Sequence, residues 1–455
     1  MMKKQLLSIT LAITIAASLA GCSSGAKEAP PKETQTGTSE EDKNSQEQTS
    51  EPVVITFWDE NAGPTRTPYY EELIKKFEEE NPDIKVEYVG LPWSDSKSKY
   101  DVAIQSGTTP DIGGINQSWL TDFIVKDAVL PLDDYYDNWD KKDDMIPGYI
   151  QSERDCAPDG KLYAINNTAN IPVIWYRPDV LEAKGLAVPQ SWDDVFKTIE
   201  ATTDKDNNVY GFSIRGGAGG TGVLEMMMYS YSGITEMFDE NGKSTVNAPA
   251  NVEFVERLAS LYNVYTPESD ITNGYKEMVA AFDTKVANMI YHNLGSYGEH
   301  SKTLNPDEFA ALTSVQSVNG TTSLVTNGCI SYSIFKTSKH PEEAFRFLSF
   351  LCETEQSLFW NENNGQLPTT KSAMDSDYVK NSQHISAAAA TTSDPDIHAV
   401  TLPIYLPGYA DIHENVLPSQ FQEVLLGNKT AQEFLDAWAD EMTKLKAEYD
   451  QYLKQ

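Results

Sequence analysis

The alternation of hydrophobic and polar positions predicts an α/β fold. "VVITFWDE" (53–60) has the short apolar run of a buried strand that ends near Trp58, and "IKVEYV" (84–89) alternates as a second strand. Between them, "PYYEELIKKFEEENPD" repeats its apolar residues at helical spacing and stops at Asn81-Pro82. The face that this helix would bury comprises Tyr70, Leu73, Ile74 and Phe77. A strand, a helix and a strand in this order predict a mainly parallel sheet covered by helices, with ligands bound beyond the carboxyl ends of the strands.

Later segments carry helix signals as well. One helix is expected from Pro178 and another after Ser191, whose side chain can cap it. "HPEEAFRFLSFLC" predicts an amphipathic helix with Pro341 in its first turn and with these residues inward: Ala344, Phe345, Leu348 and Leu351. A capping box from Thr430 to Glu433 opens the last helix. Its apolar face contains Phe434, Trp438, Met442, Leu445 and Tyr449. The tryptophans that sit in such helical patterns are expected in the core: Trp192, Trp360 and Trp438.

The first 51 residues predict export and attachment. A short basic start is followed by an apolar run, Leu6 to Leu19, which is too short to span a bilayer because a spanning helix needs about 20 residues. The run closes with Leu-Ala-Gly-Cys, which resembles a bacterial lipobox, so residues 1–21 would be a lipoprotein signal peptide and Cys22 the lipidated new N-terminus. Ordinary signal cleavage with an unmodified Cys22 is the alternative. Residues 22–51 would form a disordered tether, because 23–51 contain no aromatic residue and no Leu, Ile, Val or Met.

The remaining chain is large and acidic. Roughly 400 residues exceed one compact core and predict two lobes or domains. The chain has 68 acidic and 35 basic residues, a formal net charge of −33. Such a field repels phosphate backbones and anionic lipids, so binding to nucleic acid or directly to a membrane surface is disfavoured. The net negative charge does not by itself indicate a function.

Cysteine spacing indicates neither a disulfide scaffold nor a thiolate zinc site. Beyond Cys22 there are only Cys156, Cys329 and Cys352, without a C-x-x-C pair. Free buried thiols are the first expectation, and a Cys329–Cys352 bridge is the alternative in an oxidising location.

A glycine-rich stretch, G-A-G-G-T-G at 217–222, fits the G-x-G-x-x-G spacing of a dinucleotide site. Such a site also needs a strand that ends in an acidic residue about 20 positions later. Here Asp239 and Glu240 fall in a turn, and an Arg-Gly pair separates the motif from the strand-like run. The spacing is therefore better explained by a tight connection between a strand and a helix.

Six stretches together resemble a known family: "ITFWDE…YYEELIKKFEEENPDIKVEYV", "YDVAIQSGTTPDI", "DGKLYAINNTANIPVIWYRPDVLEAKGLAVPQSWDDV", "FDTKVANMIYHNLGSY", "ISYSIFKTSKHPEEAFRFLSFLC" and "ETEQSLFWNENNGQLPTT". In this order they are similar to the extracellular solute-binding proteins of ABC importers, in the carbohydrate-binding group that is like maltose-binding protein (family 1). The resemblance covers nearly all of Val53 to Leu445. The chain departs from the usual family sequence at some positions. It has Thr284-Lys285-Val286 where a Gly-Lys-Ala type sequence is usual, and Tyr297 where Trp is common. These departures obscure which sugar is recognised.

The resemblance implies a type II periplasmic-binding-protein-like fold with a ligand cleft between two lobes, each built on a mainly parallel sheet flanked by helices. The first lobe would comprise 53–166 plus 325–362, and the second 167–324 plus 363–455. The chain would cross between the lobes near 166–168, 322–327 and 364–367.

The resemblance also brings candidate sugar-binding residues to the cleft. Sugars need aromatic faces for their C–H surfaces, and amides, carboxylates or guanidinium groups for their hydroxyls. The candidates are Trp58, Glu60, Asn116, Trp119, Asn170, Arg215, His292, Asn293, Tyr297 and Glu414, with His413 beside the last. The stretch 215–222 would be a loop that faces the cleft.

The implied function is capture of a mono- or oligosaccharide and delivery to the membrane permease subunits of an ABC importer. The protein would be a monomer, anchored by lipid to the extracellular face of a bacterial cell with a single membrane, and would have no cofactor, no metal and no catalytic residues. One alternative keeps the fold and binds a polyamine, thiamine or iron; iron would use tyrosines such as Tyr229, Tyr231, Tyr405 and Tyr409. The other is a tethered glycosidase, which would need two carboxylates about 5–10 Å apart.

Overall fold

The computed structural model describes residues 51–454. The predicted strand–helix–strand unit is confirmed as β1 (Val53–Asp59), α1 (Thr67–Glu80) and β2 (Ile84–Gly90). The buried residues of α1 are the four expected, Tyr70, Leu73, Ile74 and Phe77. Helix α1 ends before Pro82, where the Asn81 amide donates back to the carbonyl of Phe77 at 2.9 Å. The export signal, Cys22 and the tether up to residue 50 lie outside the described residues.

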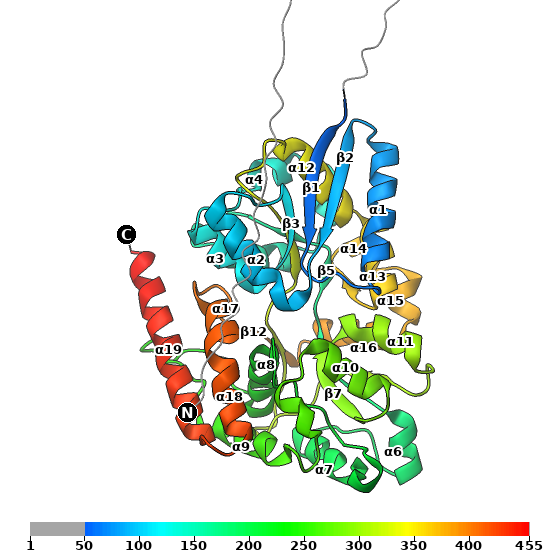
Figure 1. Cartoon of the computed structure of the whole chain (residues 1–455), viewed down its shortest axis with the longest axis vertical. Helices are drawn as coiled ribbons and strands as arrows, with labels where there is room; N and C mark the ends of the chain where they lie inside the picture. Colours follow the sequence, from blue (N-terminus) through cyan, green and yellow to red (C-terminus); the bar gives the residue numbers. More distant parts are fainter. Residues whose placement is uncertain (1–50, 455) are drawn as a thin grey trace, which may run out of the picture. The chain divides into compact units, whose positions relative to one another are not determined.

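The first lobe is built on a sheet of strand order β2-β1-β3-β10-β4 within the described residues. The added strands are β3 (Ile112–Asn116), β4 (Ile165–Asn166) and β10 (Ile330–Ile334). The helices of this part of the chain are α2 (Trp93–Ser106), α3 (Gln117–Val125), α4 (Asp133–Asn138), α5 (Pro147–Asp155), α12 (Pro341–Cys352) and α13 (Thr354–Asn364). Figure 1 shows β1, β2 and α1 in blue beside α2 and α3 in cyan, with the later helices α12 and α13 returning to the same lobe.

The second lobe contains a sheet of order β7-β6-β8, made of β6 (Pro172–Tyr176), β7 (Met289–Asn293) and β8 (Ala310–Leu312). A separate pair joins β9 (Thr322–Thr326) to β12 (Ile397–Thr401). The helices from this half of the sequence are α6 (Pro178–Lys184), α7 (Trp192–Thr202), α8 (Gly220–Ser232), α9 (Pro249–Leu261), α10 (Tyr275–Asp283), α11 (Tyr297–Thr303), α14 (Lys371–Met374), α15 (Asp377–Asn381), α16 (Gln383–Ser393), α17 (Tyr409–Asp411), α18 (Leu417–Leu425) and α19 (Ala431–Tyr452). Short 3-10 turns occupy Lys142–Asp144, Lys205–Asn207, Glu268–Ile271 and Leu294–Ser296.

The expectation of mainly parallel sheets is wrong for the β7-β6-β8 sheet of the second lobe and only partly right for the first lobe, whereas the separate β9–β12 pair is parallel. Strand β1 is parallel to β2 and β3, but β10 is antiparallel to β3 and β4. Both pairs of β6, with β7 and with β8, are antiparallel. The reason lies in the crossings: β10 and β6 receive the chain from the other lobe and begin at the ligand pocket, with Ile330 and Pro172 on its wall. They must run away from the pocket, whereas β1, β3 and β7 run toward it.

Two crossings form a small ribbon between the lobes. The segment after β4 becomes β5 (Thr168–Ala169), which pairs in antiparallel register with β11 (Leu367–Pro368). The crossings expected near 166–168 and 364–367 fall on these strands, while the residue boundaries of the lobes stay a prediction. The chain also returns to the first lobe after β12, because the Asp122 carboxylate of α3 accepts from the Gly408 amide at 2.7 Å.

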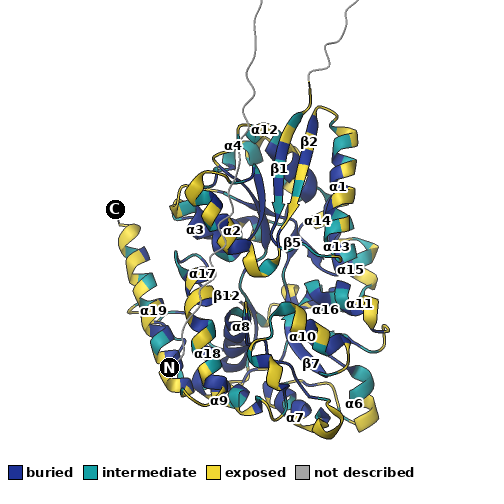
Figure 2. Cartoon of the chain, viewed as in Figure 1, coloured by how far each residue is buried: buried dark blue, intermediate teal, exposed yellow. Residues whose placement is uncertain are grey.

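The helix starts and buried helix faces that the sequence predicts are confirmed. Ser191 and Thr430 each cap a helix and take part in a capping box, with Asp194 and Glu433 respectively. The inward residues expected for α12 are buried, and so are those of α19 except Leu445, which is half-buried. Trp192, Trp360 and Trp438 are core residues as predicted, and Figure 2 shows the buried positions gathered along the inner faces of the elements. Cys156, Cys329 and Cys352 are free thiols, so the alternative of a Cys329–Cys352 bridge is not seen.

Among residues 51–454, none of the helices combines the length and the apolarity that crossing a membrane requires.

Candidate functional site

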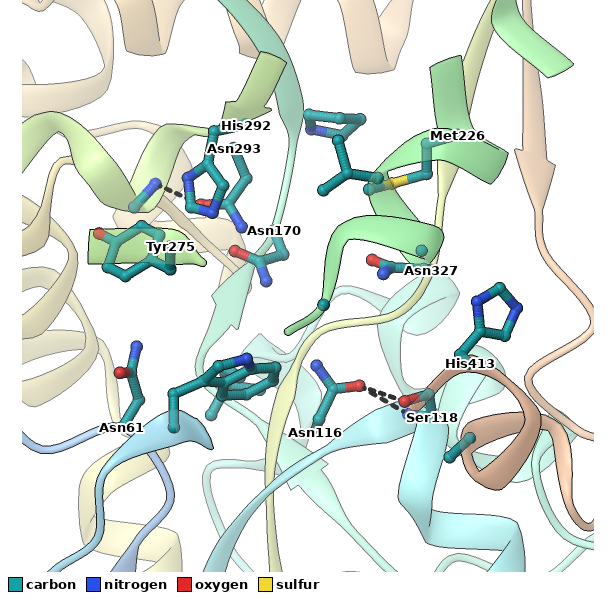
Figure 3. A pocket seen from close by; sticks show the side chains of 18 of the residues that line it. Asn61, Asn116, Ser118, Asn170, Met226, Tyr275, His292, Asn293, Asn327 and His413 are labelled. Atoms are coloured by element: carbon teal, nitrogen blue, oxygen red, sulfur yellow. Dashed lines mark hydrogen bonds between the residues drawn. The ribbon is translucent and has the colours of Figure 1, made fainter. Parts of the chain in front are cut away.

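A pocket that is partly open to solvent lies between the lobes. Its first-lobe wall follows the carboxyl ends of β1, β2 and β3, where Asn61, Trp93 and Asn116 are found. Its second-lobe wall includes Asn293 at the carboxyl end of β7. Figure 3 shows amide and aromatic side chains from both walls pointing into the same space. The rule that ligands bind beyond the carboxyl ends of strands therefore located the pocket.

Two stacked tryptophans form an aromatic wall. The rings of Trp93 and Trp119 lie 5.4 Å apart at 28° to each other. Trp119 is only 2% exposed, whereas Trp93 is half-buried and keeps one face available. The Trp119 Nε1–H donates to Glu414 Oε1 at 3.0 Å, which fixes the inner ring. Trp93 is therefore the ring that can meet a ligand.

Glu414 belongs to a π-helical turn, Ile412–Val416, of the kind that often marks functional sites. Burial raises the pKa of its carboxyl to about 7, against the lowering effect of Lys97 and of the Trp119 hydrogen bond. On the same segment, the Tyr409 hydroxyl donates to Glu225 Oε2 at 2.6 Å, and His413 Nε2 lies 3.0 Å from that oxygen. Glu225 of α8 thus holds two pocket residues in place.

The glycine-rich stretch forms a compact connection into α8. A Cβ on Gly216 would come within 2.5 Å of the Asp270 carbonyl oxygen, and one on Gly217 within 2.4 Å of the Thr272 carbonyl oxygen. Gly219 has φ +76° and precedes the first residue of α8. These glycines serve close backbone packing, as expected of a tight strand-to-helix connection. Arg215, Gly219 and Gly222 also line the pocket, so the expected cleft-facing loop is present as well.

Arg215 is the charged group that this loop presents. It is 7% exposed, its Nε donates to the Ala218 carbonyl at 2.6 Å, and its Nη2 is buried without a partner. Burial lowers the pKa of the guanidinium to about 10. Asp270 positions the loop, because its carboxylate accepts from the Ile214 amide at 2.6 Å and from the Ser213 hydroxyl at 2.9 Å.

Tyr275 and His292 complete this side of the pocket. Their rings lie 4.7 Å apart, and the Arg215 guanidinium lies 5.9 Å from the Tyr275 ring centre. Burial, and then the charge of Arg215, lower the pKa of His292 well below its usual 6.5, so the imidazole is neutral at neutral pH. Its Nδ1 is buried and has no partner.

Most predicted site residues line the pocket, but their part in ligand binding stays a prediction. Those on the wall are Asn116, Trp119, Asn170, Arg215, His292, Asn293 and Glu414, with His413 beside them. Three do not line it: Trp58, Glu60 and Tyr297. The sequence interpretation did not include Asn61, Arg66, Trp93, Tyr275, Asn327, Gln366 and Tyr409, which do.

The three misplaced residues have clear structural reasons. Strand residues alternate between faces, so Phe57 enters the core and Trp58 turns to the opposite face, where its ring packs 5.4 Å from Tyr100. Glu60 is fully buried beneath the wall and pairs with Arg66 at 3.3 Å. Tyr297 stacks on His384 with ring centres 4.1 Å apart. Trp93, like Trp58, is a tryptophan near the carboxyl end of a predicted strand, and this signal could have found it.

The tyrosines considered for iron are not gathered together. Tyr229 and Tyr231 are buried in α8, Tyr405 packs against Tyr449, and only Tyr409 of the four lines the pocket. Among residues 51–454, no group of three His, Cys, Asp or Glu side chains is arranged to hold a metal ion.

Comparisons with known proteins agree with the two-lobe arrangement. A putative binding protein of Brucella abortus is 28% identical over 366 residues, which are 79% of this chain and 85% of that protein. An ABC substrate-binding protein from Listeria monocytogenes, solved in complex with cycloalternan, superposes with a TM-score of 0.74 at 21% identity, over 87% of this chain and 99% of the other. An ABC transporter solute-binding protein from Thermotoga lettingae, bound with α-D-tagatose, gives 0.76 at 20% identity, over 87% and 100%.

The fold and pocket are thus those of a two-lobe protein that encloses a solute. A family model described as bacterial extracellular solute-binding protein matches residues 63–357, which is more than half of the chain. The chain therefore belongs to the family of bacterial extracellular solute-binding proteins.

Proposed function

We propose that this protein captures a carbohydrate outside the cell and delivers it to the membrane permease subunits of an ABC importer. The observation that carries the proposal is the pairing of an aromatic wall with polar groups across one pocket. Trp93 offers a flat apolar face, and Asn170 and Asn293 stand on the opposite lobe. A pyranose has the matching surfaces, C–H groups on its faces and hydroxyls around its rim.

Relatives support a sugar as the solute. The Listeria protein was solved with cycloalternan and the Thermotoga protein with tagatose, and both share the two-lobe fold over most of this chain. A binding role also agrees with the family and leaves no need for turnover. Incubation of purified protein with oligosaccharides, followed by chromatography, should yield no cleavage products; products would favour the glycosidase alternative.

A ligand panel tests the carbohydrate proposal directly. Neutral and acidic mono- and oligosaccharides are compared with spermidine, thiamine and ferric ion by thermal melting of the purified protein. A ligand that binds only the folded state raises stability by RT ln(1 + [L]/Kd), which is about 2.7 kcal/mol at 100 times Kd. We expect at least one sugar to raise the melting temperature by several degrees. A shift with spermidine, thiamine or ferric ion and none with any sugar would overturn the proposal.

The lipid anchor is proposed from the Leu-Ala-Gly-Cys sequence that ends at Cys22. Lipidation at this position would hold the acidic protein near the importer, as a monomer without cofactor. Cys22→Ser should move the protein from the membrane fraction to the medium, because the variant lacks the thiol that would carry the lipid. Retention of the variant in the membrane fraction would contradict the proposed anchor.

A further inference from the structure

We infer that the captured sugar carries an anionic group, a carboxylate or a phosphate, which binds at Arg215; this deepens the proposed function and rests on it. The inference comes from the hydrogen-bonding groups that the pocket leaves free. Several of them are amide N–H donors, and one is a charged donor without a counter-ion.

The orientation of two amides is fixed by the backbone. Asn116 Oδ1 accepts from the Ser118 backbone N–H at 2.9 Å and from the Ser118 hydroxyl at 2.7 Å. Asn293 Oδ1 accepts from the Gly295 backbone N–H at 2.9 Å. A backbone N–H can only donate, so each amide oxygen must face it and each amide NH₂ is left for the pocket. Figure 3 shows the Asn116 oxygen turned toward Ser118 in this way.

A third amide follows the same pattern, and one hydroxyl is already committed. Asn170 Oδ1 accepts from Gln366 Nε2 at 3.2 Å, which leaves the Asn170 NH₂ free. The Tyr409 hydroxyl gives its proton to Glu225. Among the described residues that line the pocket, Glu414 supplies the one carboxylate, and one of its oxygens already accepts from Trp119. Gln366 Oε1 is a further acceptor on the wall and has no partner, so the charged donor Arg215 is the group that distinguishes this pocket.

The charges point the same way. Two guanidinium groups line the pocket, Arg66 and Arg215. Arg66 is paired with Glu60 at 3.3 Å. Within the described part of the chain, Arg215 has no carboxylate within 4.0 Å, and its buried Nη2 has no hydrogen-bond partner. A buried charge without a partner is costly, and a carboxylate or phosphate is the group that an arginine fork binds best.

The backbone packs closely on the guanidinium on one side, and Arg215 lines the pocket on the other. Gly219 lies against the guanidinium, since a Cβ at this position would fall 2.3 Å from Arg215 Nη2. The neutral His292 adds no second positive charge but offers an unpartnered Nδ1. The acid group of a bound sugar would therefore meet Arg215, with the sugar ring directed toward Trp93.

Calorimetry with matched sugar pairs tests the inference on the full-length protein. The probes are D-galacturonate against D-galactose, D-glucuronate against D-glucose, and D-glucose 1-phosphate, with the α-1,4-linked trimers of galacturonate and glucose as longer ligands. We expect an acidic member to bind about 10- to 100-fold more tightly than its neutral counterpart, the worth of one charge-assisted hydrogen-bond pair. A preference for the uronates identifies a carboxylate, and a preference for the sugar phosphate identifies a phosphate. Equal or tighter binding of the neutral sugars would overturn the inference and leave the proposed function standing, whereas failure of every sugar would overturn both.

Substitution of Arg215 provides the second test. Arg215→Met keeps an unbranched apolar stem and removes the charge; we expect the ratio of acidic to neutral affinity to fall about 10- to 100-fold. Arg346→Met is the matched control, because Arg346 is a surface residue paired with Asp83 and should leave the ratio unchanged. Arg215→Lys retains the charge but loses the planar fork, so it should keep only part of the preference for the acidic sugar. It replaces the Met variant as the test if that variant folds poorly, and a full preference in Arg215→Lys would then contradict a guanidinium fork. An unchanged ratio in a folded Arg215→Met variant would show that the acid group binds elsewhere and would overturn the assignment.

Discussion

Trp58 and Trp93 differ in what surrounds their rings, although each lies near the carboxyl end of a neighbouring strand. Trp93 lines the pocket and covers Trp119, whereas Trp58 packs on Tyr100 away from the pocket wall. We predict that Trp93→Ala lowers sugar affinity about 30- to 1000-fold, the usual cost of 2–4 kcal/mol for a central aromatic anchor, with little change in the denaturant midpoint. Trp58→Ala should lower the free energy of unfolding by about 2–4 kcal/mol and leave affinity nearly unchanged. Titration calorimetry and urea unfolding of both variants measure the two effects, and a normal affinity in Trp93→Ala would contradict the aromatic wall.

At the scale of an element, helix α5 carries a buried carboxyl between the sheet and the interlobe ribbon. Glu153 accepts from the Ser331 hydroxyl at 2.5 Å and from the Asn166 amide at 2.9 Å, and its Oε2 has no partner. Burial raises its pKa from 4.5 to about 7. In the pH range between these values the folded protein holds a proton that the unfolded chain releases, so stability falls as pH rises from 4.5 to 7. The total loss from this group is about 3 kcal/mol.

Glu153→Gln mimics the protonated form and should remove this part of the pH dependence. Urea unfolding at pH 5 and pH 8 is the measurement, and the loss of stability between them should be smaller in the variant by about 3 kcal/mol. Glu71→Gln, at an exposed position of α1, is the control and should resemble the unsubstituted protein. An equal pH dependence in Glu153→Gln would show that Glu153 is ionised in the folded state at low pH.

At the scale of the whole described region, the lobes touch directly beside the pocket. The Thr65 hydroxyl, next to the pocket residue Arg66, donates to Glu299 Oε1 of α11 at 2.9 Å. Contacts of this kind exist only while the lobes are together, and a ligand that binds both walls favours that state by its differential affinity. We predict that saturating sugar lowers the radius of gyration in small-angle scattering.

Thr65→Val should shift the same equilibrium toward separated lobes. The change removes one hydrogen bond worth about 0.5–1.5 kcal/mol, so sugar affinity should fall about 2- to 10-fold while the walls of the pocket stay intact. Thr392→Val, on the exposed surface of α16, is the matched control. A radius of gyration that does not respond to sugar would count against hinged closure altogether.

Much of the fold and part of the site can be read from the printed residues. Local interactions carry the information for helix starts and buried faces, and the capping boxes at Ser191 and Thr430 lie where the pattern predicts. The strand–helix–strand order likewise indicated a pocket beyond the strand ends. Strand direction could not be read in the same way, because β6 and β10 owe their antiparallel pairing to the side from which the chain enters each lobe.

Part of the candidate site could likewise be predicted from the sequence, and part of it depends on contacts between distant segments. The family resemblance, together with residue type, identified Asn116, Trp119, Arg215 and Asn293, which line the pocket. The packing within the first lobe decided that Trp93 faces the pocket and Trp58 does not, since Trp58 packs against Tyr100 and Trp93 stacks on Trp119. The unpaired charge of Arg215 also depends on the tertiary structure. Whether a buried guanidinium has a counter-ion is decided by segments that are distant in the chain, and the spacing of residues along the sequence does not show which of these segments pack against it.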